Sequence, residues 1–123
     1  MKILLSVKPE YAQKIFNGEK RYEFRRTIFK RGGIQTVIVY VSHPIRKIVG
    51  EFYIEEVISD KLDILWNNTK EHAGISERAY LQYFNGKNIG HAMKIKSVKK
   101  YNKPFCIKEH WGLLPPQSFI YIE

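Results

Sequence analysis

The stretch Ser6-Val7-Lys8-Pro9-Glu10-Tyr11-Ala12, followed by Gly18-Glu19-Lys20-Arg21-Tyr22-Glu23-Phe24-Arg25-Arg26, predicts a strand, a short helix and a second strand in succession. Pro9 suits the first turn of a helix, and Gly18 can end that helix in the left-handed conformation. An apolar stripe with helical spacing lies between them, made of Tyr11, Ala12, Ile15 and Phe16. We therefore expect a strand over residues 2–7, a helix over residues 9–17 and a strand over residues 20–26.

The second strand of this unit carries a cluster of charges. Side chains alternate along a regular strand, so Arg21, Glu23 and Arg25 share one face. Lys20 is then expected on the opposite face from Glu23, and both side chains enter one cleft only if a bulge redirects one of them. A surface ion-pair ladder of Glu23 with the two arginines is the simplest alternative to a binding site, and such a ladder adds little stability.

The segment SVKPEYAQKIFNGEKRYEFRR resembles the signature of the ASCH domain family, whose members are small PUA-like barrels. The segments Tyr40–Pro44, Ile48–Phe52 and Gly112–Phe119 resemble the central strands and the closing segment of that family, so the resemblance covers effectively the whole chain. In the family, a G-x-K-x-x-E-x-R element borders a ligand cleft. The resemblance implies that the matching residues Lys20, Glu23 and Arg25 border such a cleft here.

Length and patterning indicate one domain over residues 1–123 of the mixed α+β class. We expect further strands over residues 35–41, 47–58, 89–98 and 118–122, and short helices over residues 61–73 and 76–85. About six strands with about two to three short helices favour a mixed β-barrel with helical inserts. This agrees with the PUA-like fold that the resemblance implies.

The charge of the chain is strongly and unevenly basic. Twenty-one Lys and Arg residues against twelve Asp and Glu residues give a net charge of +9. Residues 1–50 hold eleven basic and three acidic residues, and residues 91–123 hold six and two, whereas the middle holds four and seven. In a closed barrel the first and last strands are commonly neighbours, so the two basic ends can form one surface that attracts phosphates. We expect RNA or a nucleotide-like ligand as partner; the alternative is that the lysines only solubilise the protein.

Other classes of site find no support in the sequence. No apolar run approaches the roughly 20 residues of a membrane helix, and the first residues are too short for a signal peptide, so we expect a cytoplasmic protein without a membrane partner. The single cysteine, Cys106, has no companions at zinc-ligand spacing, and the four histidines are scattered. We therefore expect no metal, no cofactor and a monomer.

The candidate ligand-binding residues combine these signals. Ser6 and Lys8 lie where Pro9 opens a helix whose free N–H groups can meet an anion. The full set of expected ligand-binding residues is Ser6, Lys8, Lys20, Glu23, Arg25, Arg26 and Ser42. Aromatic residues can add platforms for base stacking, although most rings in so small a protein are expected in the core. The candidate platforms include Tyr22, Tyr40, Tyr53, Tyr83, Phe84 and Trp111.

Catalysis is the alternative to binding alone, with Lys20, Glu23 and Tyr40 as candidate catalytic residues. Some ASCH-related proteins are amidohydrolases that remove an acetyl group from a modified cytidine, using a threonine three residues after the lysine. Glu23 occupies that position here, so the nucleophile of those relatives is missing. Other relatives are described as ribonucleases, and Lys20, Tyr40, Ser42 and His43 provide residue types for acid-base and phosphate-stabilising roles.

Overall fold

The computed structural model describes residues 1–123 and contains one six-stranded sheet with the order β2-β5-β4-β3-β1-β6. The elements are β1 Lys2–Val7, α1 Pro9–Asn17, β2 Tyr22–Arg25, β3 Thr36–Val41, β4 Lys47–Lys61, α2 Leu62–Thr69, the 3₁₀ turn η1 Lys70–His72, α3 Glu77–Tyr83, β5 Ile89–Phe105, α4 Ile107–Trp111 and β6 Phe119–Ile122. The prediction of a mixed α+β fold with six strands is confirmed.

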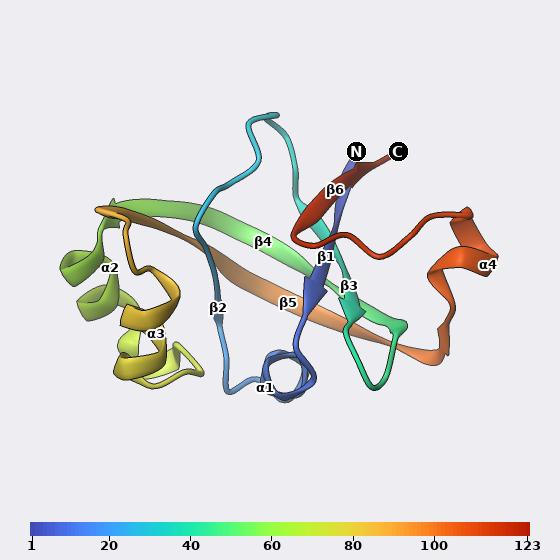
Figure 1. The fold of residues 1–123 in the computed structure, drawn as a ribbon, viewed down its shortest axis with the longest axis horizontal. Coiled ribbons are helices and arrows are strands. Elements are labelled where there is room, and N and C mark those ends of the chain that lie inside the picture. The colour runs from blue at the N-terminus through green and yellow to red at the C-terminus, as the bar shows by residue number, and fades with distance from the viewer.

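The long antiparallel pair of β4 and β5 forms the spine of the molecule (Figure 1). α2 and α3 lie at one end of this pair and α4 at the other, while α1 lies below it. β1 runs parallel to β3 and antiparallel to β6, so the two ends of the chain lie side by side. The expectation that the first and last strands are neighbours is therefore correct.

The sheet is not closed into a barrel, which corrects the expectation of a barrel. β2 pairs only with β5 and β6 only with β1, so these two strands are the edges of the sheet. β2 has only four residues in its ladder, and no backbone ladder joins it to β6. The contact between these regions comes from side chains instead: the Arg25 guanidinium donates to the hydroxyl of Ser118, just before β6.

The helices also differ from expectation in number and length. The single helix predicted over residues 61–73 is α2 followed by η1. The helical turn that the sequence indicates over residues 107–111 is confirmed as α4. β5 continues to Phe105, well past the end expected at residue 98. The ladder shows why: Lys100 lies opposite Gly50 and Phe105 opposite Ile48, so the intervening residues form a bulge within the strand.

Three apolar clusters hold the elements together. The largest packs α1, through Ala12 and Ile15, against β1 and β3. A second cluster is centred on Tyr80 and Phe84 of α3 and joins α2 and α3 to β2 and β5. The third surrounds Ile107 and fixes α4 to the sheet. None of the helices has the length and apolar character needed to cross a bilayer.

Candidate functional site

A hollow of about 450 Å³ opens between the end of β1, the first turn of α1, the edge strand β2 and α3. Its volume lies within the roughly 300–1,000 Å³ that is typical of small-molecule sites. Its lining residues are Ser6, Val7, Lys8, Tyr11, Lys20, Glu23, Phe24, Arg25, Ile75, Ala79, Gln82 and Tyr83. We call this hollow the β2 pocket. Five of the predicted ligand-binding residues line it, namely Ser6, Lys8, Lys20, Glu23 and Arg25.

Lys20 is a buried lysine that forms part of the pocket wall. Its side chain is only 2% exposed, and its Nζ donates to the carbonyl oxygen of Ala73 at 2.7 Å. The same Nζ lies 4.9 Å from the ring centroid of Phe24, within the range of a cation–π interaction. Burial lowers the pKa of Lys20, while the nearby Glu23 carboxylate acts to raise it. The ammonium group is thus held in one position in a low-dielectric wall.

Two glycines make room for this lysine. Gly18 ends α1 with φ +89°, and the chain then turns so that the backbone N–H of Lys20 donates to the Lys14 carbonyl. Gly74 lies against the lysine stem, where a Cβ would sit 2.5 Å from the Cβ of Lys20. Gly74 also has φ +69°, which favours glycine. The local backbone geometry therefore determines the direction of the Lys20 side chain before β2 begins.

Glu23 is the second buried charge of the pocket. Its side chain is 8% exposed, and its Oε2 atom is buried without a hydrogen-bond partner. Burial raises the pKa of Glu23, and the positive charges of Lys20 and Arg25 oppose that shift. Since buried polar atoms in proteins are nearly always hydrogen-bonded, a free carboxylate oxygen in a pocket wall is an acceptor available to a ligand.

The expectation that Lys20 and Glu23 point to opposite faces of a strand is wrong. β2 begins at Tyr22, so Lys20 lies in the turn that precedes the strand and does not follow its alternation. No bulge is needed, because the turn alone brings both side chains to the same pocket. The surface ion-pair ladder is excluded as well, because Glu23 is buried and the structure contains no salt bridge at this residue.

The pocket is also lined by Arg25, Ser6 and Lys8, which we call its rim. Arg25 donates through its guanidinium to the Ser118 hydroxyl, while its Nε is buried without a partner. The Ser6 hydroxyl donates to the Pro116 carbonyl oxygen at 2.5 Å, so it is already engaged. Lys8 is exposed at the N-terminus of α1. The rim thus offers one free cation and one partly free guanidinium.

Three predicted site residues lie outside the β2 pocket. Arg26 donates to the carbonyl oxygens of Tyr83 and Asn85, and so holds the end of α3. Tyr40 is 5% exposed and packs in the apolar cluster around Ile107. Ser42 lies in the turn between β3 and β4, where its backbone N–H donates to the Val7 carbonyl. None of the three lines the hollow.

Of the α3 residues at the pocket, Tyr83 was among the candidate stacking platforms, whereas Gln82 was missed in the sequence. Gln82 and Tyr83 line the pocket from α3, and Ser118 reaches its rim from the far end of the chain. A periodic pattern around Tyr80 was visible, but nothing in it indicates which strand the helix faces. The signal that could have indicated this contact is Tyr83, a half-buried aromatic residue with a polar hydroxyl that follows the buried Tyr80 in the helix.

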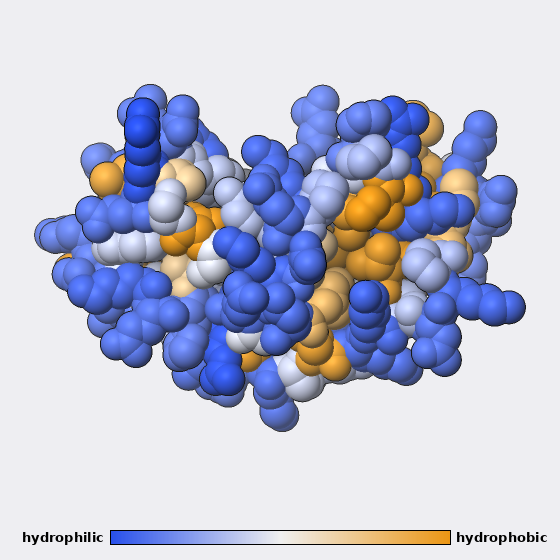
Figure 2. All heavy atoms as spheres, turned by 90° about the horizontal axis from the view of Figure 1, so that it is seen from below, coloured by the Kyte–Doolittle hydropathy of each residue, from blue (hydrophilic) through white to orange (hydrophobic).

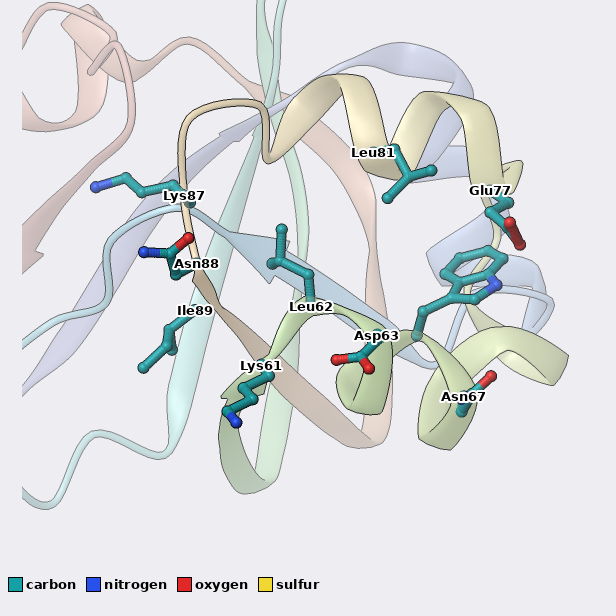
Figure 3. A pocket seen from close by; sticks show the side chains of 10 residues that line it. Lys61, Leu62, Asp63, Asn67, Glu77, Leu81, Lys87, Asn88 and Ile89 are labelled. Carbon is teal, nitrogen blue, oxygen red and sulfur yellow. The ribbon is translucent and has the colours of Figure 1, made fainter.

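A larger hollow of about 790 Å³ lies on the other side of α2 and α3 (Figure 3). In this view Lys87 lies at one end of it and Glu77 at the other. Lys61 and Asp63 lie close together between these ends, beside Leu62. All four of these charged residues are exposed or half-buried, so no buried polar atom points to a ligand there. We therefore place the candidate site in the β2 pocket.

The positive charge of the protein is not neutralised internally. The structure contains one salt bridge, between Lys94 and Glu55 at 2.9 Å, although the chain has twenty-one basic residues. Figure 2 shows the face seen from below, where polar residues dominate and a polar strip separates two areas of exposed apolar atoms. A surface with many unpaired cations attracts anionic partners at long range.

The family model of the ASCH domain matches residues 5–105. The chain belongs to the ASCH domain family. The resemblance inferred from the signature segment is thereby confirmed. The ASCH match includes the end of β1, α1 and β2, the region that carries the charged residues of the pocket.

Relatives of this ASCH chain have different names. It is 32% identical to a large ribosomal subunit protein uL22 of Ureaplasma parvum over 98% of its own length, but it spans only 39% of that protein. It is 26% identical to an ASCH domain-containing ribonuclease of Zymomonas mobilis, covering 97% of this chain and 82% of the relative. A crystal structure of a serine-to-alanine variant of an ASCH protein from Zymomonas mobilis matches with TM-score 0.91 and 26% identity, over 99% of this chain and 88% of that one.

Proposed function

We propose that this ASCH chain binds RNA and that its β2 pocket receives one nucleotide of the strand. The observation that carries the proposal is the pair of buried charges in the pocket wall, Lys20 and Glu23, of which the carboxylate keeps a buried oxygen without a partner. Membership of a family with a ribonuclease-named relative supports an RNA-related role. The unpaired positive charge of the protein supports an anionic partner.

Each group at the pocket has a task in this proposal. Lys8 at the exposed rim and the guanidinium of Arg25 contact phosphate. The Glu23 carboxylate accepts hydrogen bonds from the N–H groups on the edge of a base. The rings of Tyr11 and Tyr83, which line the same hollow, provide apolar walls for that base. The positive charge of Lys20 favours the ionised form of the Glu23 carboxylate.

Calorimetric titration of nucleoside monophosphates tests the proposal. We expect Lys8→Ala to weaken binding of any monophosphate about tenfold, because one charge-assisted hydrogen bond is worth roughly 1.5–3 kcal/mol when formed and less at an exposed rim. Glu23→Gln should instead change which base is preferred, because an amide presents a donor where the carboxylate presents only acceptors. Lys61→Ala is the matched control, since it removes the same charge from an exposed site at the other hollow. Equal affinities and equal base preferences in all variants would contradict the assignment of the pocket.

Hydrolysis of RNA is the second candidate function. It is favoured by the ribonuclease-named relative and by the hydroxyl groups at the pocket, which belong to Ser6, Tyr11, Tyr83 and Ser118. Structures of the Zymomonas mobilis ASCH protein include variants in which one serine or one tyrosine was replaced. A buried lysine next to a buried carboxylate also provides residue types for acid-base chemistry.

Incubation with a radiolabelled single-stranded RNA separates the two candidates. The binding proposal expects the RNA to be recovered intact after complex formation. Cleavage by the parent protein that disappears in Glu23→Gln, with RNA affinity retained, would make the second candidate the correct one. Cleavage that persists in this variant would contradict a catalytic role of Glu23, and persistence in Lys20→Ala as well would indicate a contaminating nuclease.

A further inference from the structure

Exposed lysines lie along the outer half of β5, away from the β2 pocket. Consecutive residues such as Lys99 and Lys100 point to opposite faces of the sheet, so these lysines flank the edge of the strand from both sides, and we call them the lysine row. β2 pairs with β5 only from His91 to Lys94, so beyond Ile95 this strand has β4 as its single neighbour and its other edge is open. The exposed lysines of this strand and of α4 are Lys96, Lys99, Lys100, Lys103 and Lys108. None of them is in a salt bridge, because the one salt bridge of the structure belongs to Lys94.

The acidic residues near this row neutralise little of it. Glu109 is the one acidic residue between Lys94 and Trp111. Glu51 lies opposite Lys99 in the ladder, but it is 9% exposed and its two carboxylate oxygens accept the hydroxyls of Tyr53 and Tyr101. The Glu51 carboxylate is therefore held by two tyrosines, and its negative charge offsets part of the positive charge of the nearby Lys99. The lysine row remains a field of positive charge on an open strand edge.

Aromatic rings lie at the end of the same row. The bulge of β5 carries Tyr101, whose ring stacks on Phe105 with centroids 5.9 Å apart. Phe105 contacts His110 and Trp111 of α4 at 4.7 and 5.7 Å, and these two rings meet at 4.7 Å. His110 is exposed and Trp111 half-buried, so ring surface is open to solvent beside the lysines. We call the five lysines with His110 and Trp111 the β5–α4 surface.

We propose that the β5–α4 surface is a second contact site for RNA, at which the lysines bind the phosphates of a single strand and His110 and Trp111 stack on its bases. Lysines along an open edge are also a means of preventing sheet-to-sheet aggregation, but that role requires no aromatic rings beside them. Alternating phosphates and bases of an unpaired strand match a surface that offers both cations and ring faces. The inference rests on the RNA partner proposed above, but not on the β2 pocket.

α1 connects the two contact regions. Its first turn, with Lys8 and Tyr11, lines the β2 pocket. Its last turn packs Phe16 so closely on β4 that a Cβ at Gly50 would lie 2.8 Å from the ring, and 2.5 Å from the Lys99 carbonyl oxygen. The lysine row therefore begins beside the helix that opens the pocket.

Two probes test this surface separately from the pocket: uridine monophosphate and an oligouridylate of roughly 16 nucleotides, the upper end of what one small β domain covers. The variant Lys99→Gln, Lys100→Gln, Lys103→Gln should bind the oligouridylate about tenfold or more weakly and the monophosphate unchanged. The slope of log affinity against log salt should fall by about 2, since each released phosphate contact contributes about 0.7 for single strands. The matched control is Lys61→Gln, Lys70→Gln, Lys87→Gln, which removes three charges from the far end of the molecule.

Stacking has its own readout. The chain has two tryptophans, so in Trp66→Phe the fluorescence comes from Trp111 alone. We expect the oligouridylate, but not the monophosphate, to quench it, and His110→Ala to weaken oligouridylate binding by roughly threefold to tenfold. His110 is exposed, so this variant tests stacking even where Trp66→Phe fails to fold.

The outcomes divide clearly. Equal losses in the two triple variants would show a general effect of net charge and overturn the proposal, as would an unchanged affinity of the β5 variant. A parent protein that binds the monophosphate but gains no affinity from the longer strand overturns the β5–α4 surface and leaves the pocket proposal standing. A parent protein that binds the oligouridylate through β5 but no monophosphate overturns the pocket proposal alone.

Discussion

Two lysines illustrate the difference between the two basic regions of this ASCH chain. Lys20 in the β2 pocket is buried, donates to a backbone carbonyl and lies over an aromatic ring. Lys99 on β5 is exposed and has no carboxylate in salt-bridge contact. The buried lysine is fixed in one geometry, and its electrostatic interactions with nearby charges are strong because water does not screen them. The exposed lysine interacts with other charges through solvent and salt, which screen it. The pocket is thus suited to selecting a base, and the edge of β5 is suited to binding the phosphate backbone of RNA.

The largest expected difference between the two lysines is in stability. Lys20→Ala should lower the free energy of unfolding by about 3 kcal/mol, because it leaves a cavity, an unpaired Ala73 carbonyl and a buried Glu23 without its counter-charge. Lys99→Ala should change it by less than about 0.5 kcal/mol, as is usual for exposed positions. Urea unfolding of both variants beside the parent measures the two effects. Similar midpoints for the two variants would mean that Lys20 is not held as the structure shows.

A smaller effect should appear when stability is followed against pH. The pKa of Glu23 is raised in the folded protein by burial, so its contribution to stability is greatest below the ordinary glutamate pKa and is lost as pH rises through the folded value. Glu23→Gln removes this dependence, so the melting temperature of the parent should fall relative to that of the variant as pH rises through this window. Glu56→Gln is the matched control, because its side chain is exposed on the long strand pair. If the difference in melting temperature between the parent and Glu23→Gln stays constant over this pH range, the raised pKa of Glu23 is contradicted.

The smallest expected effect is the absence of one activity. Glu23 occupies the position of the threonine nucleophile of the cytidine-deacetylating relatives, and its buried carboxylate cannot supply the hydroxyl that those relatives use for acyl transfer. Incubation with N4-acetylcytidine should therefore release no acetate above background, by coupled enzymatic assay. Acetate release that vanishes in Glu23→Gln would show that the pocket is catalytic. The pocket would then differ from the β5–α4 surface in catalysing a reaction, and not only in selecting a base.

The sequence alone determined the local elements and the charge of this protein. Pro9, Gly18 and the apolar stripe between them placed α1, because these signals act within one turn of chain. A run of β-branched and aromatic residues placed β3, and alternating side chains placed most of β4. The excess of basic residues followed from counting. The G-x-K-x-x-E-x-R element also named three pocket residues, Lys20, Glu23 and Arg25.

Only the tertiary structure decided which side chains meet. Lys20 joins Glu23 because the turn after Gly18 displaces it from the strand, which a strict alternation of side chains could not predict. The open sheet, the burial of Tyr40 and the contact of Arg25 with Ser118 all depend on residues far apart in the chain. Short-range preferences set each segment, but the pocket arises from packing between segments, and no local pattern encodes which segments pack together.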